Sequence, residues 1–143
     1  HALYLAAIDR YCREVVDSSA GELERAAEPL AAIRQLFLNI PAAAARHGKR
    51  GCLLCNAAVE RAPVDPDVKA EVSGGFNRLG TAFRRSLDRA RAAGELETDA
   101  DTAALADYLL SGYVGLIVLA KAGRKPAQLR RTAELILAPL GAG

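Results

Sequence analysis

Two cysteines set three residues apart offer the most distinct chemistry in this sequence. Cys52 and Cys55 form a Cys-Leu-Leu-Cys motif, directly after Gly51 and at the expected start of a helix. A thiol at a helix N-terminus is stabilised as a thiolate by the helix dipole, and a CxxC pair can form a disulfide. The plainer interpretation is two small buried hydrophobic residues, because free cysteine is among the most buried residue types. We favour burial and keep a redox-active pair as the alternative.

The same region does not predict a metal site or an enzyme active centre. His47, Cys52 and Cys55 lie close together in the sequence, but a structural zinc site uses four ligands and a fourth is not evident. The sequence has two histidines, His1 and His47, and it contains no GxSxG, Walker or HExxH motif. We therefore expect no catalytic residue, no metal and no cofactor.

Charge and cysteine usage limit the class of protein. The chain has 19 Lys and Arg against 17 Asp and Glu, a net charge of +2, which is too balanced for a chain that binds nucleic acid phosphates by itself. With Cys12 the number of cysteines is odd, which argues against a disulfide framework and favours a reducing, cytoplasmic setting. The charge-free run 108–120 is shorter than the roughly 18 apolar residues of a membrane span, so we expect no membrane partner.

The hydrophobic pattern predicts one all-α domain over residues 1–143, a six-helix bundle with orthogonal and antiparallel packing. Alanine is abundant and no segment alternates with period two. The first helix is expected over Ala2 to Asp17, with Leu5, Ile8, Cys12 and Val15 buried, and the DSSAG segment 17–21 should end it. The other helices are expected from Glu22 or Pro29 to Arg46, from Cys52 to Arg61, from Pro66 to Gly94 with Asp65 as N-cap, from 99–101 to Gly123, and from Lys125 and Pro126 to about Leu140.

Glycines and aromatic residues on the fourth expected helix point either to tight packing or to a cavity. Gly74, Gly75 and Gly80 each cost about 1 kcal/mol of helix stability relative to alanine. Close packing against the helix, or open space beside it, would explain why glycine occurs at these positions. Small-molecule sites combine apolar walls with few polar groups, whereas an aromatic stripe at helical spacing is usually core. The candidate cavity residues are Phe37, Cys55, Phe76, Leu79, Phe83 and Tyr108, with Asn56, Ser111 and Tyr113 as polar contacts.

The run Tyr108 to Ala120 predicts a partner chain. It carries no charge on any face, and a helix that is apolar all round must be covered on all sides. A six-helix domain gives limited cover to a helix at its edge, whereas a second copy would supply the rest. Gly112 and Gly115 would let another backbone approach closely. We therefore expect a homodimer with twofold symmetry.

Three segments resemble the ligand-binding domain of TetR-family transcriptional regulators. The run 50–67, RGCLLCNAAVERAPVDPD, has a Gly-Cys start, an Asn four residues after that Cys and a final Asp-Pro-Asp. The segment 1–11, HALYLAAIDRY, resembles the helix that follows the helix-turn-helix of these regulators, and 89–123, RARAAGELETDADTAALADYLLSGYVGLIVLAKAG, resembles a later part of the domain. Cys55 departs from the aliphatic residue that is usual at its position.

This resemblance implies an effector pocket between the first five helices and a four-helix dimer interface made by the last two helices of each copy. It also implies a DNA-binding domain upstream. Since residue 1 is His and Met does not occur, we expect a piece of a longer protein that binds operator DNA only through that missing domain. The expected interface residues are Leu105, Leu109, Gly112, Leu116, Leu129, Ala133 and Ile136.

The function implied is effector binding and dimerisation in a regulator, most simply a repressor released from DNA by a small, largely apolar ligand. A thiol-based redox-sensing regulator that uses Cys52 and Cys55 is the alternative. A helical interaction module without a ligand is the third interpretation, and the presence or absence of a cavity beside Phe76 and Phe83 distinguishes it from the first.

Overall fold

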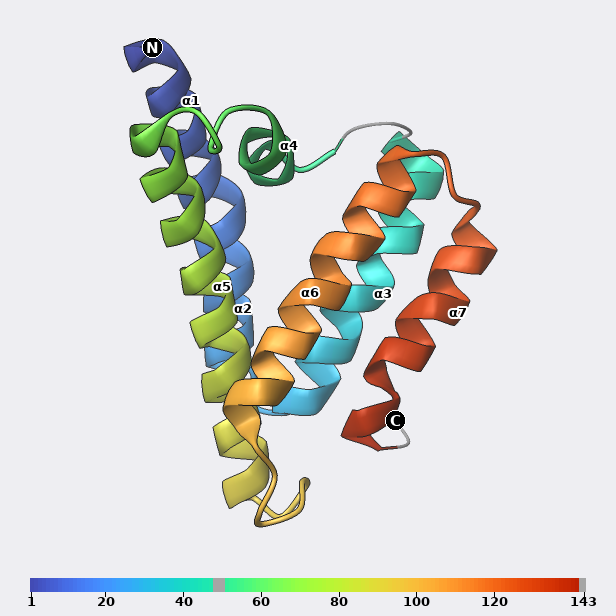
Figure 1. The fold of residues 1–143 in the computed structure, drawn as a ribbon. Coiled ribbons are helices and arrows are strands. Elements are labelled where there is room, and N and C mark those ends of the chain that lie inside the picture. The colour runs from blue at the N-terminus through green and yellow to red at the C-terminus, as the bar shows by residue number, and fades with distance from the viewer. Residues whose placement is uncertain (48–50, 142–143) are drawn as a thin grey trace.

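The structure is a computed structural model that describes residues 1–47 and 51–141, all of them in helices or their connections (Figure 1). Its elements are α1 (Ala2–Tyr11), the π-turn η1 (Cys12–Val16), α2 (Asp17–Arg25), α3 (Pro29–His47), α4 (Leu53–Glu60), α5 (Pro66–Ala92), α6 (Thr102–Lys121), α7 (Pro126–Leu137) and the short 3₁₀ turn η2 (Ala138–Leu140). Because α1, η1 and α2 follow one another without a break, the described residues form six helical rods, and the predicted all-α class is confirmed.

Two layers of helices make up the domain (Figure 1). The continuous rod α1–η1–α2 packs along α5 on one side, and α6 packs against α3 and α7 on the other. The long contact between α5 and α6 joins the two layers. The short helix α4 lies across the end of the domain where the chain starts, and it packs against α1 and α5.

The first helix is longer than predicted. The DSSAG segment 17–21 was expected to end it, but the helix continues to Arg25. Contacts with α5 explain the difference: Leu23 is buried, the Arg78 side chain donates to Asp17 at 2.8 Å, and the Arg85 side chain donates to Glu24 at 3.1 Å. Tertiary contacts of this kind outweigh a weak local preference for a turn.

The π-turn shifts the buried face of this rod by one position. Val15 was expected to be buried, but it is 43% exposed, whereas Val16 is 7% exposed. A π-turn holds one more residue than an α-turn, so the next inward position falls one residue later along the chain. Ile8 and Cys12, before and at the start of the turn, are buried as predicted.

The end of α2 is capped by side chains of α5. The Ser86 hydroxyl donates to the Leu23 carbonyl at 3.2 Å, and Arg89 donates to the carbonyls of Leu23 and Ala26, both at 2.7 Å. The last carbonyls of an α-helix have no partner within the helix. These bonds therefore satisfy the C-terminus of α2 and fix it to α5.

An aromatic cluster forms the centre of the core between α3, α5 and α6. Phe37 and Phe83 are fully buried, with ring centroids 6.1 Å apart. Tyr113 meets both rings edge-on, at 5.6 Å from Phe37 and 6.3 Å from Phe83. Edge-to-face contacts at these distances add stability beyond that of burial alone.

Gly75 marks the closest approach of other elements to α5. A Cβ at this position would overlap Cδ2 of Leu54 on α4 and would lie 3.1 Å from Sγ of Cys12, and both of these side chains are buried. At Gly80 the nearest atom is Leu110 Cδ2 at 3.5 Å, and at Gly74 it is Arg78 Nη1 at 3.7 Å, which are ordinary contacts. Of the three helix glycines, Gly75 is the one explained by tight packing.

Neighbouring glycines should therefore respond oppositely to alanine. We expect Gly75→Ala to lower the free energy of unfolding by up to about 2 kcal/mol, because overpacking costs roughly 1–3 kcal/mol and the helix propensity of alanine returns about 1 kcal/mol. Gly74→Ala should raise the free energy of unfolding by up to about 1 kcal/mol, because its methyl group meets no crowded atom. Urea unfolding measures the change in the free energy of unfolding for each variant. If both changes had the same sign, α4 would not be packed tightly against α5 at Gly75.

Candidate functional site

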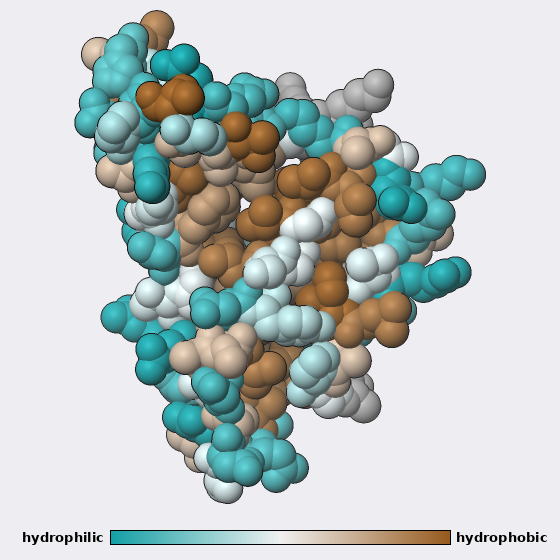
Figure 2. Space-filling view, in the orientation of Figure 1, coloured by the Kyte–Doolittle hydropathy of each residue, from teal (hydrophilic) through white to brown (hydrophobic). Residues whose placement is uncertain are grey.

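A small, mostly apolar cavity lies between the π-turn, α4, α5 and α6. Its volume is about 40 Å³. In Figure 2 hydrophobic side chains, coloured brown, border a hollow between α5 and α6 below α4. The apolar lining residues are Val15, Val16, Leu54, Phe76, Leu79, Val114 and Ile117, and the others are Tyr11, Ser19, Cys52, Cys55, Gly75 and Tyr113.

A wider groove adjoins this cavity on the side of α3. It measures about 320 Å³ and is lined by further residues of α3, including Leu36 and Ile40. Five residues line both spaces: Tyr11, Ser19, Cys52, Tyr113 and Ile117. These shared side chains form the partition between the cavity and the groove, so a movement of one of them would join the two spaces.

The size of the cavity limits what it holds in this arrangement. A water molecule needs about 10–15 Å³ of such volume, so a few waters fit. Pockets for drug-sized ligands measure about 300–1,000 Å³. A larger molecule would have to displace the partition and enter the groove as well.

Polar chemistry in the cavity centres on the Cys52 thiol at the N-cap of α4. The pKa of Cys52 is lowered to about 6, chiefly because the Cys55 thiol donates to its sulfur, with smaller contributions from the Tyr11 hydroxyl and from the backbone N–H groups of Leu54 and Cys55. These donors outweigh burial, which raises the pKa. The thiolate form of Cys52 is therefore favoured relative to an ordinary cysteine.

The neighbours of Cys52 have their pKa values moved in the opposite direction. The pKa of Cys55 is raised, first because its thiol donates to Cys52 and second because it is buried. Burial is the main cause that raises the pKa of Tyr11, and it raises the pKa of Tyr113 to about 12. The raised pKa values of these three groups favour their neutral, protonated forms beside Cys52.

Four of the nine predicted cavity residues line the cavity: Cys55, Phe76, Leu79 and the polar contact Tyr113. Phe37 and Phe83 lie behind it, where their rings support the ring of Tyr113. Asn56 faces the surface, and its Oδ1 accepts from Lys121 Nζ at 2.6 Å.

The remaining two predicted residues lie on the outward face of α6. Tyr108 is 42% exposed, and the exposed Ser111 hydroxyl donates to the Asp107 carbonyl at 2.8 Å. Leu109, Leu116 and the ring of Tyr113 occupy the inward face instead. The cavity therefore excludes Tyr108 and Ser111, and the polar contact on α6 is Tyr113.

Sequence reasoning did not name the other wall residues as ligand contacts: Tyr11, Val15, Val16, Ser19, Cys52, Leu54, Gly75, Val114 and Ile117. Ile117 lies one helical turn after Tyr113, and this i, i+4 relation was available as a signal. The π-turn brings Val15 and Val16 to the same wall, and no pattern in the sequence indicated that turn. The weak metal candidate His47 has a side chain outside the described part of the chain.

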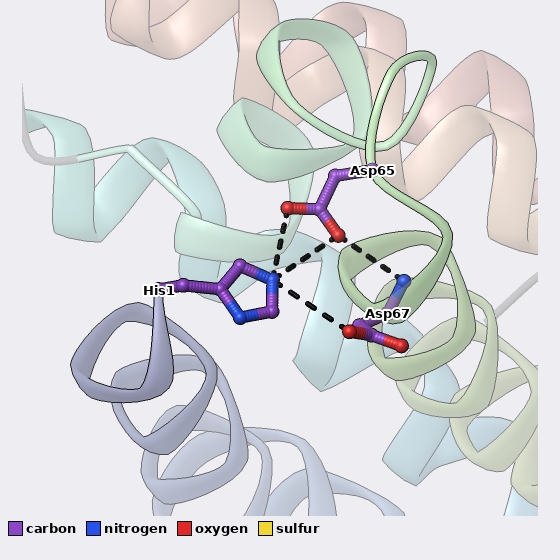
Figure 3. Close-up of side chains that lie close together, drawn as sticks. All are labelled: His1, Asp65 and Asp67. Carbon is purple, nitrogen blue, oxygen red and sulfur yellow. Dashed lines mark hydrogen bonds and ion pairs between the residues drawn. The ribbon is translucent and has the colours of Figure 1, made fainter.

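A second polar cluster joins the start of α1 to the start of α5 (Figure 3). His1 Nε2 lies 3.2 Å from Asp65 Oδ2 and 3.7 Å from Asp67 Oδ2. Asp65 is the N-cap of α5, and its Oδ1 accepts from the N–H groups of Asp67 at 3.1 Å and Val68 at 3.2 Å. The three side chains lie close enough to hold a cation. Because Asp65 is already committed as a cap and lies 3.4 Å from Arg61 Nη2, we interpret the cluster as a polar link between two helix starts.

The helices α6 and α7 both carry exposed apolar side chains on the outer side of the domain. α6 is long and apolar enough to cross a membrane by length and composition alone, and 17% of its most apolar 18-residue window is buried. Its inward residues Leu109 and Leu116 pack in the core of this helical domain. Helical spacing places the following residues on the other side, which we call the α6–α7 outer face: Tyr108, Ser111, Gly115 and Val118 of α6, and Thr132 and Leu135 of α7.

The predicted interface residues divide into two groups. Leu109, Leu116, Leu129 and Ala133 are buried within the single chain, at 0–1% exposure. Leu105, Gly112 and Ile136 are half-buried, and the Ile136 side chain packs onto Gly112, where a Cβ would lie 2.8 Å from Cγ2. A second copy would therefore contact mainly the α6–α7 outer face. The four buried residues would pack beneath that face, inside the single chain.

Comparisons with known proteins agree on one group of relatives. Residues 29–136 match the family described as "Tetracyclin repressor-like, C-terminal domain". The chain is 31% identical over 126 residues to the transcriptional regulator AcuR of Cereibacter sphaeroides, covering 87% of this chain and 57% of that protein. It is 31% identical over 121 residues to the uncharacterized HTH-type transcriptional regulator YezE of Bacillus subtilis, covering 83% of this chain and 62% of that protein.

The fold also matches a solved structure. A TetR transcriptional regulator from Chloroflexus aurantiacus superposes with a TM-score of 0.80 at 23% identity, covering 95% of this chain and 69% of that one. The chain thus spans about three fifths of the length of the curated relatives it matches, 57% and 62%.

Proposed function

The chain belongs to the family of TetR-like C-terminal domains, and on this premise we propose that it is the effector-binding and dimerisation part of a transcriptional regulator. The observation that carries the effector role is the apolar cavity with few polar groups between the π-turn, α4, α5 and α6. This combination of apolar walls and few polar groups is typical of small-molecule sites. The regulator would be a non-catalytic, cytoplasmic homodimer, and DNA would be bound by a domain outside this chain.

The ligand would act through the first helix. Val15 and Val16 of the π-turn and Tyr11 at the end of α1 all line the cavity, so a ligand contacts this helix directly. A ligand shifts a conformational equilibrium only by its difference in affinity for the two states. An effector that fits only when the partition moves would favour one position of α1, and it would thereby release the regulator from DNA.

The walls define the class of effector. They are mainly aliphatic and aromatic, and Tyr11, Ser19 and Tyr113 supply hydroxyl groups for one or two hydrogen bonds. We therefore propose a small, largely apolar molecule with one polar end. The unliganded cavity is far smaller than such a molecule, so binding would have to extend into the groove beside α3.

Unbranched alcohols from butanol to octanol are suitable probes for this site. We expect saturable binding to the reduced chain, with affinity rising up to about fourfold per methylene, because burying one CH₂ contributes about 0.8 kcal/mol. Val114→Phe should reduce the affinity by about tenfold or more, because the larger ring fills the cavity. Titration calorimetry measures both affinities.

The matched control is Val59→Phe, which adds the same ring on α4 at a position that is 77% exposed. This variant should bind the alcohols as the original chain does. Circular dichroism would show that both variants keep their helices. Non-saturable binding to the original chain, or equal affinity in the Val114 variant, would contradict the effector role of the cavity.

A further inference from the structure

We propose that Cys52 and Cys55 form an oxidisable dithiol in the cavity wall, which a hydroperoxide converts to a disulfide. This assignment goes beyond the effector role, because it adds a covalent modification site to the same space. It also gives the two cysteines a role that an apolar ligand does not require.

The local backbone places the two sulfur atoms on the same side of the helix start. Cys52 is the N-cap of α4, with φ −84° and ψ 126°, and Cys55 is the third residue of the helix. In this relation the N-cap side chain and the side chain of the third helical residue both lie at the first turn of the helix. Residues three apart have Cβ atoms about 5–6 Å apart, so a small adjustment brings them to disulfide distance. Both residues line the same cavity.

Burial separates this pair from the third cysteine. Cys52 is half-buried and also lines the open groove, so a small peroxide can reach it. Cys55 is 7% exposed and lies directly behind it. Cys12 is 1% exposed, and burial raises its pKa. Of the three cysteines, Cys52 alone combines access to solvent with a lowered pKa, and Cys55 is its neighbour.

The groups that face Cys52 support the reaction. Cys55 on α4 and Tyr11 on α1 act to lower the pKa of Cys52, and Tyr113 and Lys121 on α6 are the other titratable groups that act on the pair. The thiolate, rather than the thiol, is the nucleophile. The pKa of Cys52, about 6, therefore makes the nucleophile available at neutral pH.

The reaction balances with a hydroperoxide as the two-electron oxidant. The Cys52 thiolate attacks the outer peroxide oxygen, the O–O bond breaks, and the departing alkoxide or hydroxide takes up a proton to leave as alcohol or water. This step gives a sulfenic acid at Cys52. The Cys55 sulfur then loses its proton and attacks the Cys52 sulfur, and the S–O bond breaks with release of hydroxide, which takes that proton and leaves as water.

Oxidation would also change the contact between α4 and the first helix. In the reduced chain the Tyr11 hydroxyl acts to lower the pKa of Cys52 and so favours its thiolate. A disulfide carries no charge and is a poor acceptor, so this favourable interaction with Tyr11 is lost. Tyr11 is the last residue of α1 and precedes the π-turn. Any effect of this change on effector release rests on the proposed function, whereas the disulfide itself does not.

The test is hydrogen peroxide treatment of the 143-residue chain without ligand, followed by thiol counting and peptide mass spectrometry under non-reducing conditions. We expect two of the three thiols to disappear and the single peptide that contains both Cys52 and Cys55 to lose the mass of two hydrogen atoms. The rate should rise with pH through a midpoint near the pKa of Cys52, about 6. Cys12→Ser should oxidise as the original chain does.

Two further variants assign the roles. Cys55→Ser should stop at the sulfenic acid, which dimedone traps, and Cys52→Ser should lower the rate of thiol loss by about tenfold or more, because the remaining thiols are largely protonated. Tyr11→Phe should slow oxidation below pH 7 by raising the pKa of Cys52, with Tyr4→Phe on the same helix as control. Disulfides only between chains, or loss of Cys12 as fast as loss of Cys52, would overturn the proposal. The alcohol titrations in the reduced chain are independent of both results.

Discussion

Replacing Phe83 with alanine should lower the free energy of unfolding by about 3–5 kcal/mol. The ring is fully buried and contacts the rings of both Phe37 and Tyr113. Its removal leaves a void at the junction of α3, α5 and α6, and the surrounding rings cannot close it without giving up their edge-to-face contacts. Domains of this kind are stable by about 5–15 kcal/mol, so the variant would be close to unfolding at physiological temperature.

Guanidinium unfolding followed by circular dichroism measures this effect. Phe76→Ala is the matched control, because Phe76 lies two turns earlier on the same helix and is half-buried in the cavity wall. It removes the same number of atoms but less buried area, so its cost should be well below that of Phe83→Ala. Equal costs would mean that the aromatic cluster is not the centre of the core.

Introducing a charge on the α6–α7 outer face should convert a dimer into a monomer. Val118 is 48% exposed and Leu135 is 73% exposed in the single chain. Val118→Asp and Leu135→Asp should therefore change the stability of one chain by only about 0.5 kcal/mol. Within a dimer interface the same carboxylate would be buried without a partner at a cost of several kcal/mol. We expect the dissociation constant to rise by about 100-fold or more for each variant, since each 1.4 kcal/mol is tenfold.

Sedimentation equilibrium of the original chain and its variants measures this change. Val59→Asp provides the control, because Val59 is 77% exposed on α4, away from the outer face. The control should remain a dimer at concentrations where the other two variants are monomers. A monomeric original chain, or a dimer that tolerates both charges, would contradict an interface on α6 and α7.

Helix boundaries set by local chemistry were predictable from the sequence. α5 begins at Pro66 behind its cap Asp65, and it ends at Ala92 just before Gly94, which has a φ of 80°. Three local signals set these ends: the capping carboxylate, the proline at the first helical position and the glycine after the last turn. Each lies within a few residues of the helix end that it determines. The continuation of α1 into α2 was not predictable in this way, because Arg78 and Arg85 stabilise it from a helix some 60 residues later.

The residues of the candidate site could be predicted from the sequence only on α5, which has a clear apolar stripe. Phe76 and Leu79 lie on the apolar face of α5, and that face lines the cavity. On α6 the run 108–120 is uncharged on every side, so the sequence could not indicate which side faces inward. For this reason Tyr108 and Ser111 were wrongly predicted to line the cavity. Tyr113, which was predicted, lines it together with Val114 and Ile117, which were not.

The π-turn has a consequence for how relatives of this chain can diverge. A π-turn is equivalent to the insertion of one residue into an α-helix. Deleting one codon between Cys12 and Val16 would restore a regular α-helix while the residues on both sides keep their places in the core. Because Val15 and Val16 both line the cavity, the deletion would also remove one of two adjacent side chains from its wall. A single-residue deletion could thus alter ligand preference in evolution without disrupting the fold.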